Sequence, residues 1–277
     1  MGRASLAFLI SVFLIRAGMS QCGPGSGPDG NQLARIVVEN ELRAEDADQA
    51  RWMYQLRKKH GDTTELSEVV ETKQGPLSRR IAANGGVLSA EEQKKEDERI
   101  QKLLQDPEKE KKAQQERRED SEQARKLLQM LPEAFNFTCG SAEGKLIKLN
   151  FRPNPQFHPS SRQAHVFHNM VGSILVEPRQ KRLAGIEGHL LNEVKFGGGL
   201  LGHLDKGGDF FVTQTEVAAN HWEMTRMRVN MHGKALFFKT ISVQEDETRT
   251  NYHQVPGNLT LSQAAQILRK ELLAQKK

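Results

Sequence analysis

The chain has 277 residues, a formal net charge of +5 and two cysteines, with 37% hydrophobic, 27% charged and 6% aromatic residues. This length is enough for one large domain or two small ones with a real core. The composition excludes a collagen, a disulfide-dense mini-domain and a multi-pass membrane protein, because only one long apolar run is present. The basic balance permits an anionic partner, but charge governs solubility and encounter rather than chemistry.

The N-terminus has the pattern of a secretory signal peptide. A basic start precedes an apolar run over residues 6–15, which is too short to cross a bilayer as a helix. Small residues near Ser20 fit cleavage after it, so we expect residues 1–20 to be removed and the protein to be secreted or periplasmic. Two alternatives would associate the chain with a membrane, namely an uncleaved signal anchor or a lipid attached to Cys22.

The segment after the signal peptide predicts a flexible tether. Residues 21–31 are rich in glycine and proline and offer little apolar surface to bury. Export would place Cys22 and Cys139 in an oxidising compartment, where they could form a disulfide. Because Cys22 falls in the expected tether, we predict two unconnected thiols instead.

The mature chain begins with a predicted short helix and an antiparallel meander. Apolar residues recur at helical spacing over residues 33–42. Large apolar side chains then alternate with other residues over 51–57, which is the period of a half-buried strand. Turns that contain glycine separate this strand from two more, expected over residues 65–72 and 78–83.

Residues 89–130 predict a charged helical excursion from the sheet. Ser89 and Glu92 form a capping-box pattern, and Asp106 followed by Pro107 starts a second helix. The two signs of charge are nearly balanced and no sustained heptad is present, so we expect a solvated pair of helices. The alternative is an arm that binds a partner protein.

Strand signals return after Pro132 and persist. Seven further strands are expected, over residues 147–151, 165–176, 182–196, 209–217, 221–231, 234–243 and 247–255. Turn residues separate them, including His232–Gly233 and Glu245–Asp246. This spacing is typical of consecutive antiparallel strands rather than of strand–helix–strand units.

A final helix completes the predicted fold. Thr260 and Gln263 form a second capping-box pattern, and the apolar stripe that follows would cover the sheet. The predicted fold class is therefore α+β, a mainly antiparallel, curved sheet (an incomplete β-barrel) covered by helices. Residues 32–277 are expected to form this single domain, with the helical insertion within it.

The sequence carries no convincing catalytic, cofactor or metal signature, so we predict a protein that is not an enzyme. Residues 197–202 fit the pattern G-x-G-x-x-G, but a strand follows where a dinucleotide site needs a helix. His165 and His168 would point to opposite faces of a strand and could not share one ion. Basic residues are not grouped with stacking aromatics, as nucleic-acid binding would require.

Several of the later strands carry apolar side chains on both faces. Phe237 and Phe238 are neighbours in one of them, and Trp222 and Met224 oppose Met227 in another. A sheet with two apolar faces must be covered on both or must line a cavity, and methionine suits a cavity that accepts variable shapes. The alternative is a β-bulge that shifts the phase of the strand within an ordinary core.

This order of elements resembles the lipoprotein-sorting carriers of the Lol type and their relatives. In these secreted half-barrels, an incomplete antiparallel barrel wraps helices around an apolar cavity. The resemblance covers the architecture of most of residues 32–273 and implies binding of lipids or acyl chains without chemistry. It also implies a set of cavity residues, with the last two at the mouth: Trp222, Met224, Phe237, Phe238, Leu200 and Leu201.

We therefore predict an exported envelope protein that binds a hydrophobic ligand, such as a lipid or a lipoprotein acyl chain, in a half-barrel cavity. The alternative is a structural or protein-interaction module of the envelope that holds its partner with the charged helices. A third hypothesis, which no motif supports, is a hydrolase that assembles His189, His203 and Asp205.

Overall fold

Thirteen strands and five helical segments are described by a computed structural model, which covers residues 22, 27–161, 163–196, 201–235 and 239–274. The strands are β1 (Arg51–His60), β2 (Thr63–Thr72), β3 (Gly75–Ala83), β4 (Gly86–Val87), β5 (Phe135–Cys139), β6 (Ile147–Pro153), β7 (Met170–Glu177), β8 (Arg182–Leu190), β9 (Val194–Phe196), β10 (Gly202–Leu204), β11 (Asp209–Ala218), β12 (His221–Ala235) and β13 (Lys239–Val255). The helices are α1 (Gly27–Ala47), α2 (Ala90–Leu104), α3 (Pro107–Ala134), α4 (Leu261–Ala274) and the 3₁₀ helix η1 (Gln163–Asn169).

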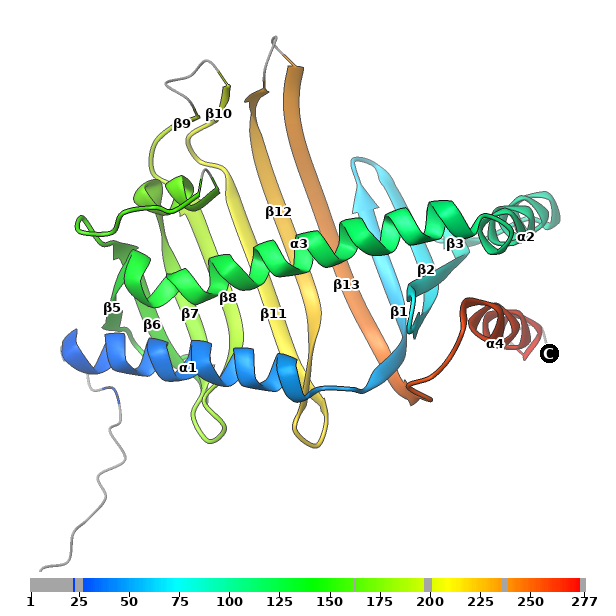
Figure 1. Ribbon diagram of the computed structural model, residues 1–277, viewed down its shortest axis with the longest axis horizontal. Coiled ribbons are helices and arrows are strands. Elements are labelled where there is room, and N and C mark those ends of the chain that lie inside the picture. Colours follow the sequence, from blue (N-terminus) through cyan, green and yellow to red (C-terminus); the bar gives the residue numbers. More distant parts are fainter. Residues whose placement is uncertain (1–21, 23–26, 162, 197–200, 236–238, 275–277) are drawn as a thin grey trace, which may run out of the picture.

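The strands form one antiparallel sheet in the order β4-β3-β2-β1-β13-β12-β11-β8-β7-β6-β5, and the short strands β9 and β10 attach to the end of β12. The two outermost strands of this order do not pair with each other, so the curved sheet stays open. Helices α1 and α3 cross one face of it side by side (Figure 1). The predicted fold class, an α+β protein with an incomplete barrel covered by helices, is confirmed.

The helix starts follow the sequence signals. The Ser89 hydroxyl accepts a hydrogen bond from the backbone N–H of Glu92, and the Glu92 carboxylate accepts one from the backbone N–H of Ser89. Asp106 caps α3 in a similar way. At α4, the Thr260 hydroxyl accepts from the Gln263 backbone N–H. These short-range hydrogen bonds satisfy N–H groups that a helix leaves without partners, which explains why local sequence located the starts.

Helices α2 and α4 cover the opposite face of the sheet at the β1–β3 end. Leu77 and Val70 are fully buried there, against Leu268 of α4 and Ile100 of α2. Side chains alternate along β1, so Met53 points to this second layer while its neighbours point to the concave face. This layer covers one face of the sheet at this end, and Trp52, Tyr54 and Val69 lie on the other face.

Strand β13 is unbroken, although the sequence predicted two strands that are separated at Glu245 and Asp246. Glu245 is exposed and Asp246 is half-buried, and Asp246 pairs with Arg228 of β12 on one side and with Lys59 of β1 on the other. Polar pairs on a solvated face support a ladder as apolar pairs do. The acidic residues therefore continue the strand.

Strand β12 likewise runs through the turn that was predicted at His232–Gly233. Gly233 lies where β10 joins the sheet, opposite Leu204. A side chain at this glycine would collide with the backbone carbonyl of His203. The glycine thus permits close approach of a neighbouring strand and does not end its own.

Residues 163–169 form the helix η1, where the sequence predicted the start of a strand. Ala164 and Phe167 are both buried, three residues apart, which is one turn of a 3₁₀ helix. The Phe167 ring lies 5.2 Å from that of Phe135. A helix of seven residues is too short for its period to be distinguished from that of a strand in the sequence. The strand expected over 182–196 is also divided, into β8 and β9.

The segment that was predicted as a tether is fastened to the sheet. Helix α1 begins within it, and Cys22 forms a disulfide with Cys139 at the end of β5, contrary to the prediction of free thiols. A sulfur in a disulfide cannot also carry a thioether-linked lipid, so lipidation of Cys22 and this bond exclude each other.

Close backbone contact explains why glycine occurs at the start of α1. A Cβ atom at Gly30 would lie 2.6 Å from the carbonyl oxygen of Phe137 in β5. The next side chain, Asn31, accepts the backbone N–H of Phe137 at 2.7 Å. The glycine therefore serves the packing of a helix on a strand, which composition alone does not distinguish from a flexible linker.

We expect a variant with serine at both Cys22 and Cys139 to lose about 2–4 kcal/mol in the free energy of unfolding. The bond joins residues 117 positions apart and so restricts a large loop of the unfolded chain. Urea denaturation followed by circular dichroism would measure the loss. A reducing agent should destabilise the native protein equally and leave the serine variant unchanged. Equal midpoints for all samples would contradict this role.

Candidate ligand-binding hollow

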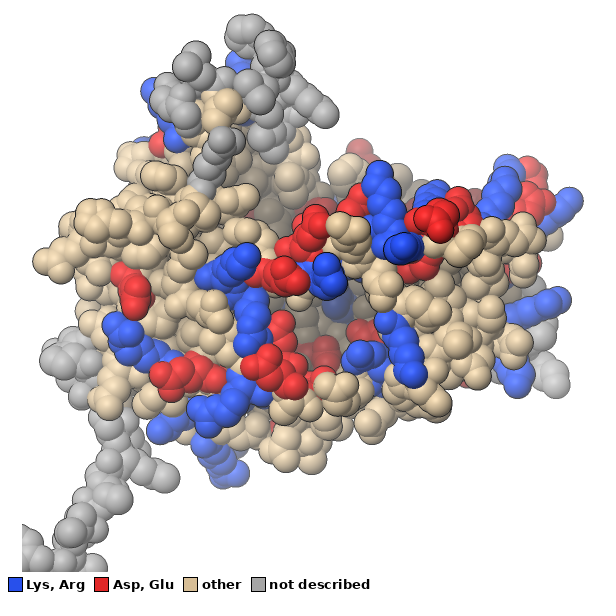
Figure 2. All heavy atoms as spheres, viewed as in Figure 1, with Lys and Arg blue, Asp and Glu red and all other residues tan. Residues whose placement is uncertain are grey.

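A hollow of about 1240 Å³ lies between the concave face of the sheet and helices α1 and α3. Figure 2 shows a recess between the two helices, with acidic and basic side chains around it. This volume exceeds that of an ordinary small-molecule pocket. The residues that α3 contributes to its wall are Ser121, Ala124, Arg125 and Leu128.

Helix α3 crosses the hollow and contacts the β2–β3 turn on one side and α1 on the other. Near its first turns, the Arg117 guanidinium donates to the backbone oxygen of Gln74 in the β2–β3 turn at 2.7 Å. Further along, Arg125 pairs with Glu45 at 2.7 Å and with Asp46 at 2.9 Å, both in α1. The helix that the sequence predicted as a solvated excursion is therefore a wall of this hollow.

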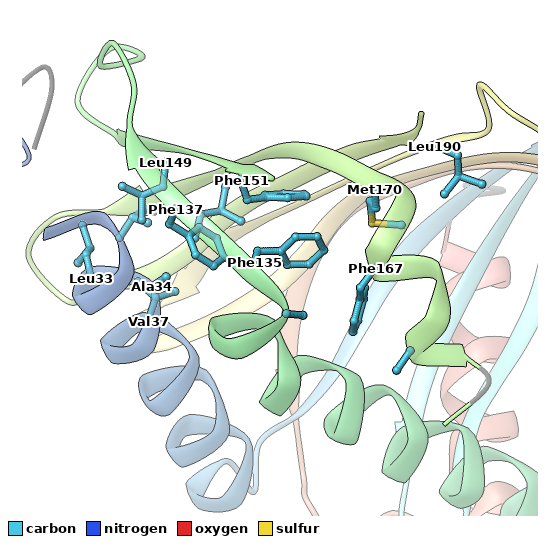
Figure 3. Packing of buried hydrophobic residues seen from close by; sticks show 14 of the residues in the cluster. Leu33, Ala34, Val37, Phe135, Phe137, Leu149, Phe151, Phe167, Met170 and Leu190 are labelled. Carbon is cyan, nitrogen blue, oxygen red and sulfur yellow. The ribbon is translucent and has the colours of Figure 1, made fainter. Parts of the chain in front are cut away.

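The other end of the concave face is filled by the protein's own side chains. Phe135, Phe137 and Phe151 pack beneath Leu33 and Val37 of α1, and all five are buried (Figure 3). Aromatic pairs in this cluster have ring centroids 4.6–6.3 Å apart. A cluster of buried phenylalanines thus fills this end of the concave face, and the hollow lies beyond it.

The arginines that line the hollow already have partners. Arg182 forms a two-point ion pair with Glu41, at 2.7 and 3.1 Å, and its guanidinium lies over the ring of Trp222. Arg43 and Arg51 each donate to a neutral oxygen atom of a nearby residue. Every arginine of the wall therefore has a hydrogen-bond partner, but only Arg125 and Arg182 are paired with carboxylates.

Three carboxylates line the floor of the hollow, those of Asp48, Glu71 and Glu223. Glu71 accepts the backbone N–H of Trp52 at 3.0 Å, and Asp48 lies 3.2 Å from His221 Nδ1. Burial raises the pKa of Glu71, and burial together with the charges of Glu71 and Asp48 raises the pKa of Glu223 to about 7. Among the described residues, neither glutamate forms an ion pair.

Aromatic side chains lie beside these carboxylates. Trp52 is 2% exposed, and its ring lies 5.7 Å from His221 and 6.1 Å from Tyr252. Tyr252 stacks on Tyr54 at 5.1 Å, and burial raises the pKa of both phenols, that of Tyr54 to about 12. The indole N–H of Trp52 is buried and is directed at the Glu223 carboxylate, whose ionised form it favours. Arg249 lies over the Tyr54 ring at 5.4 Å.

Of the three predicted cavity residues that the structure describes, one lines the hollow. Trp222 does so, and its indole N–H donates to the Gln180 side chain at 3.0 Å. Met224 is half-buried but is not part of the lining, and its backbone oxygen accepts the Tyr252 hydroxyl. Leu201 is half-buried beside β10 and also lies outside the lining. Leu200, Phe237 and Phe238 lie outside the described residues.

The lining is more polar than the sequence predicted. Charged and amide side chains predominate, and the apolar lining residues are Ala44, Ala47, Ala50, Ala124, Leu128 and Trp222. Glu71 and Glu223 were not among the cavity residues predicted from the sequence. Strand alternation gave a signal for Glu71, since it follows the buried Val69 by two positions and so shares its face.

A separate group of possible metal ligands lies at the β9–β10 hairpin. His203 Nε2 is 3.3 Å from Asp205 and 3.9 Å from Glu193, and both carboxylates are exposed. Within the ranges that the structure describes, this is the one His, Cys, Asp or Glu group with three ligand atoms within 4.8 Å of one another. His189 lines a different hollow of about 620 Å³, so it does not join the other two residues of the hydrolase hypothesis.

No protein-family model matches the sequence, and no match to a curated protein or to a solved structure was found. In the described part of the chain, none of the helices combines the length and the hydropathy that a membrane crossing needs.

Proposed function

We propose that this chain is a non-catalytic binding protein that holds an amphiphilic ligand, such as a lipid or another molecule with an acyl chain, in the hollow beneath α1 and α3. The hollow itself carries the proposal, because about 1240 Å³ remains open in a concave face that is otherwise closely packed. A hollow of this size is large enough for a small molecule, because ligand pockets commonly enclose about 300–1,000 Å³.

The lining supports an amphiphile rather than a purely apolar chain. Leu128, Trp222 and the alanines of both helices offer an apolar strip, while carboxylates and amides occupy the floor. A chain of CH₂ groups along the strip would gain about 0.8 kcal/mol for each group removed from water. The polar end of the ligand would meet the floor. The disulfide favours a secreted or periplasmic location, where such bonds persist.

The two tryptophans of the chain make the proposal directly testable. Trp222 lines the hollow and Trp52 lies against its floor, and the sequence contains no other tryptophan. Intrinsic fluorescence therefore reports on this site alone. We expect single-chain amphiphiles to change the emission in a saturable way and to displace a fluorescent fatty acid. Native mass spectrometry of the purified protein should show a bound small molecule.

A matched pair of variants tests whether the ligand occupies this hollow. Ala124→Phe places a ring in the wall, whereas Ala113→Phe adds the same ring three turns earlier on α3, outside the lining. The first should weaken binding at least about tenfold, because it removes volume from the site. The second should leave binding unchanged. If neither variant changes binding, or if no amphiphile binds the native protein, the proposal fails.

A further inference from the structure

We infer that the base of the β9–β10 hairpin binds one divalent transition-metal ion of the Zn²⁺ class, which Glu193, His203 and Asp205 hold. The inference goes beyond the proposed function, since none of these three residues lines the hollow beneath α1 and α3. It concerns a different part of the sheet, where β9 and β10 attach to the end of β12 (Figure 1).

The strand register brings the three side chains to one face of the hairpin. Leu204 pairs with Val194, so the next pair toward the base is Asp205 and Glu193. His203 is two positions before Asp205 and shares its face, because side chains alternate along a strand. Val194 and Leu204 point to the other face, where they pack in the core. The three ligands therefore lie together on the face that is turned away from the core.

The distances between the ligand atoms fit a shared ion. Nε2 of His203 lies 3.3 Å from Asp205 Oδ1 and 3.9 Å from Glu193 Oε2, and the three ligand atoms lie within 4.8 Å of one another. Zinc binds nitrogen and oxygen ligands at about 2.0–2.2 Å, which places two ligand atoms of a tetrahedral site about 3.3–3.6 Å apart. The His203–Asp205 pair already has this separation, and the exposed Glu193 side chain has only to move closer.

The two carboxylates favour a cation between them. Like charges that lie directly opposite each other on neighbouring strands are destabilising, and Asp205 and Glu193 occupy such positions. Lys195 lies 3.3 Å from Glu193, but it contacts Oε1, whereas His203 faces Oε2. In the ion pairs of the described residues, Asp205 has His203 as its partner and no lysine or arginine. A divalent ion would neutralise both carboxylates at once.

The donor atoms select the class of metal. Ca²⁺ and Mg²⁺ prefer oxygen ligands, whereas an imidazole nitrogen suits zinc, copper, iron and nickel. Both cysteines of the chain are joined in the disulfide, so no thiolate takes part. One imidazole and two carboxylates form a set that zinc accepts, with water in the fourth position. Zn²⁺ should therefore bind more tightly than Ca²⁺.

A metal ion at this place would fasten the hairpin to the sheet. The backbone N–H of Asp205 donates to the carbonyl oxygen of His232 at 2.8 Å, which links the end of β10 to β12. Glu193 is on the other side of the hairpin base, just before β9. An ion that is bound to both sides closes the base. Because it binds only the folded hairpin, it should stabilise the folded protein.

Calorimetric titration of the full chain with zinc chloride tests the site. The chain carries no histidine tag and is first treated with EDTA. We expect one Zn²⁺ per chain, bound at least about tenfold more tightly than Ca²⁺ in the same buffer. Zn²⁺ should also raise the Tm of the native chain.

Two variants assign the ion to the hairpin. His203→Gln and Asp205→Asn should each weaken zinc binding at least about tenfold, because each removes a ligand or its charge. Zn²⁺ should no longer raise the Tm of either variant. Unchanged circular dichroism spectra would show that the variants fold. Glu193→Gln, at an exposed position, makes the same test if a variant does not fold.

A second group of histidines supplies the matched control. His165 and His168 belong to η1, and their rings are 6.5 Å apart. Among the described residues, they are not part of a group of three close ligands. His165→Gln makes the same change at a histidine that has another ring nearby, so it should leave zinc binding unchanged.

Three results would overturn the metal site. These are no uptake of zinc by the native chain, equal affinity for Ca²⁺ and Zn²⁺, and zinc binding that His165→Gln removes but His203→Gln does not. His203 would then serve only as an ion-pair partner of the two acids. The proposed function is tested separately, because displacement of a fluorescent fatty acid should be the same in zinc and in EDTA.

Discussion

Replacement of Phe135 by alanine should lower the free energy of unfolding by about 3–5 kcal/mol. Phe135 is 2% exposed, and its ring lies 4.6 Å from that of Phe151 and 5.2 Å from that of Phe167. These neighbours belong to β6 and η1, which are fixed by their own hydrogen bonds and cannot close the space that the ring leaves. Urea denaturation followed by circular dichroism would give the loss.

The position of Phe135 makes the same variant informative about the hollow. It is the first residue of β5 and caps the end of α3, where its backbone N–H donates to Leu131. A cavity there should make the C-terminal end of α3 more mobile. Because α3 forms a wall of the hollow, the affinity for the ligand should fall as well. Phe157→Ala is the control, since Phe157 is half-buried at the edge of the same cluster. A loss for Phe135→Ala no larger than the control's would show that this end is loosely packed.

Local sequence determined much of the fold. The alternation around Trp52 and Tyr54 located β1, and the caps at Ser89 and Thr260 located two helices. These signals depend on neighbours within a few residues, which sequence displays directly. The predictions that were wrong concern segments whose structure depends on contacts with residues far away in the sequence. The disulfide and the close approach at Gly30 fasten the expected tether to β5.

The site was harder to foresee than the fold, because its residues come from distant parts of the chain. Asp48 follows α1, Glu71 lies near the end of β2, and Glu223 lies near the start of β12, 152 positions after Glu71. An acidic residue in a strand is ordinary, and only the crossing helices make these three line one hollow. Trp222 was predicted from the sequence and lies in the lining. Its side chain is large and aromatic, so it is easily noticed in a sequence.

Replacement of Arg79 by methionine should also lower the free energy of unfolding by about 3–5 kcal/mol. Arg79 is 4% exposed in β3, directly opposite Glu68, which is 5% exposed in β2. The guanidinium also pairs with Asp97 of α2 at 2.6 Å. Removal of the arginine leaves the Glu68 carboxylate buried with a hydrogen bond from Gln55 but without the cation opposite it.

A second variant separates a buried unpaired charge from lost packing. Methionine keeps most of the volume of Arg79, so the loss should come from Glu68, and Glu68→Gln combined with Arg79→Met should recover more than half of it. Asp97 is half exposed and water can replace its partner, so Asp97→Asn alone should cost less than about 1 kcal/mol. If the double variant is as unstable as the sum of its single changes, the two side chains act independently. In that case the α2 layer would be held by apolar contacts such as those of Ile100, and the charged pair would contribute little.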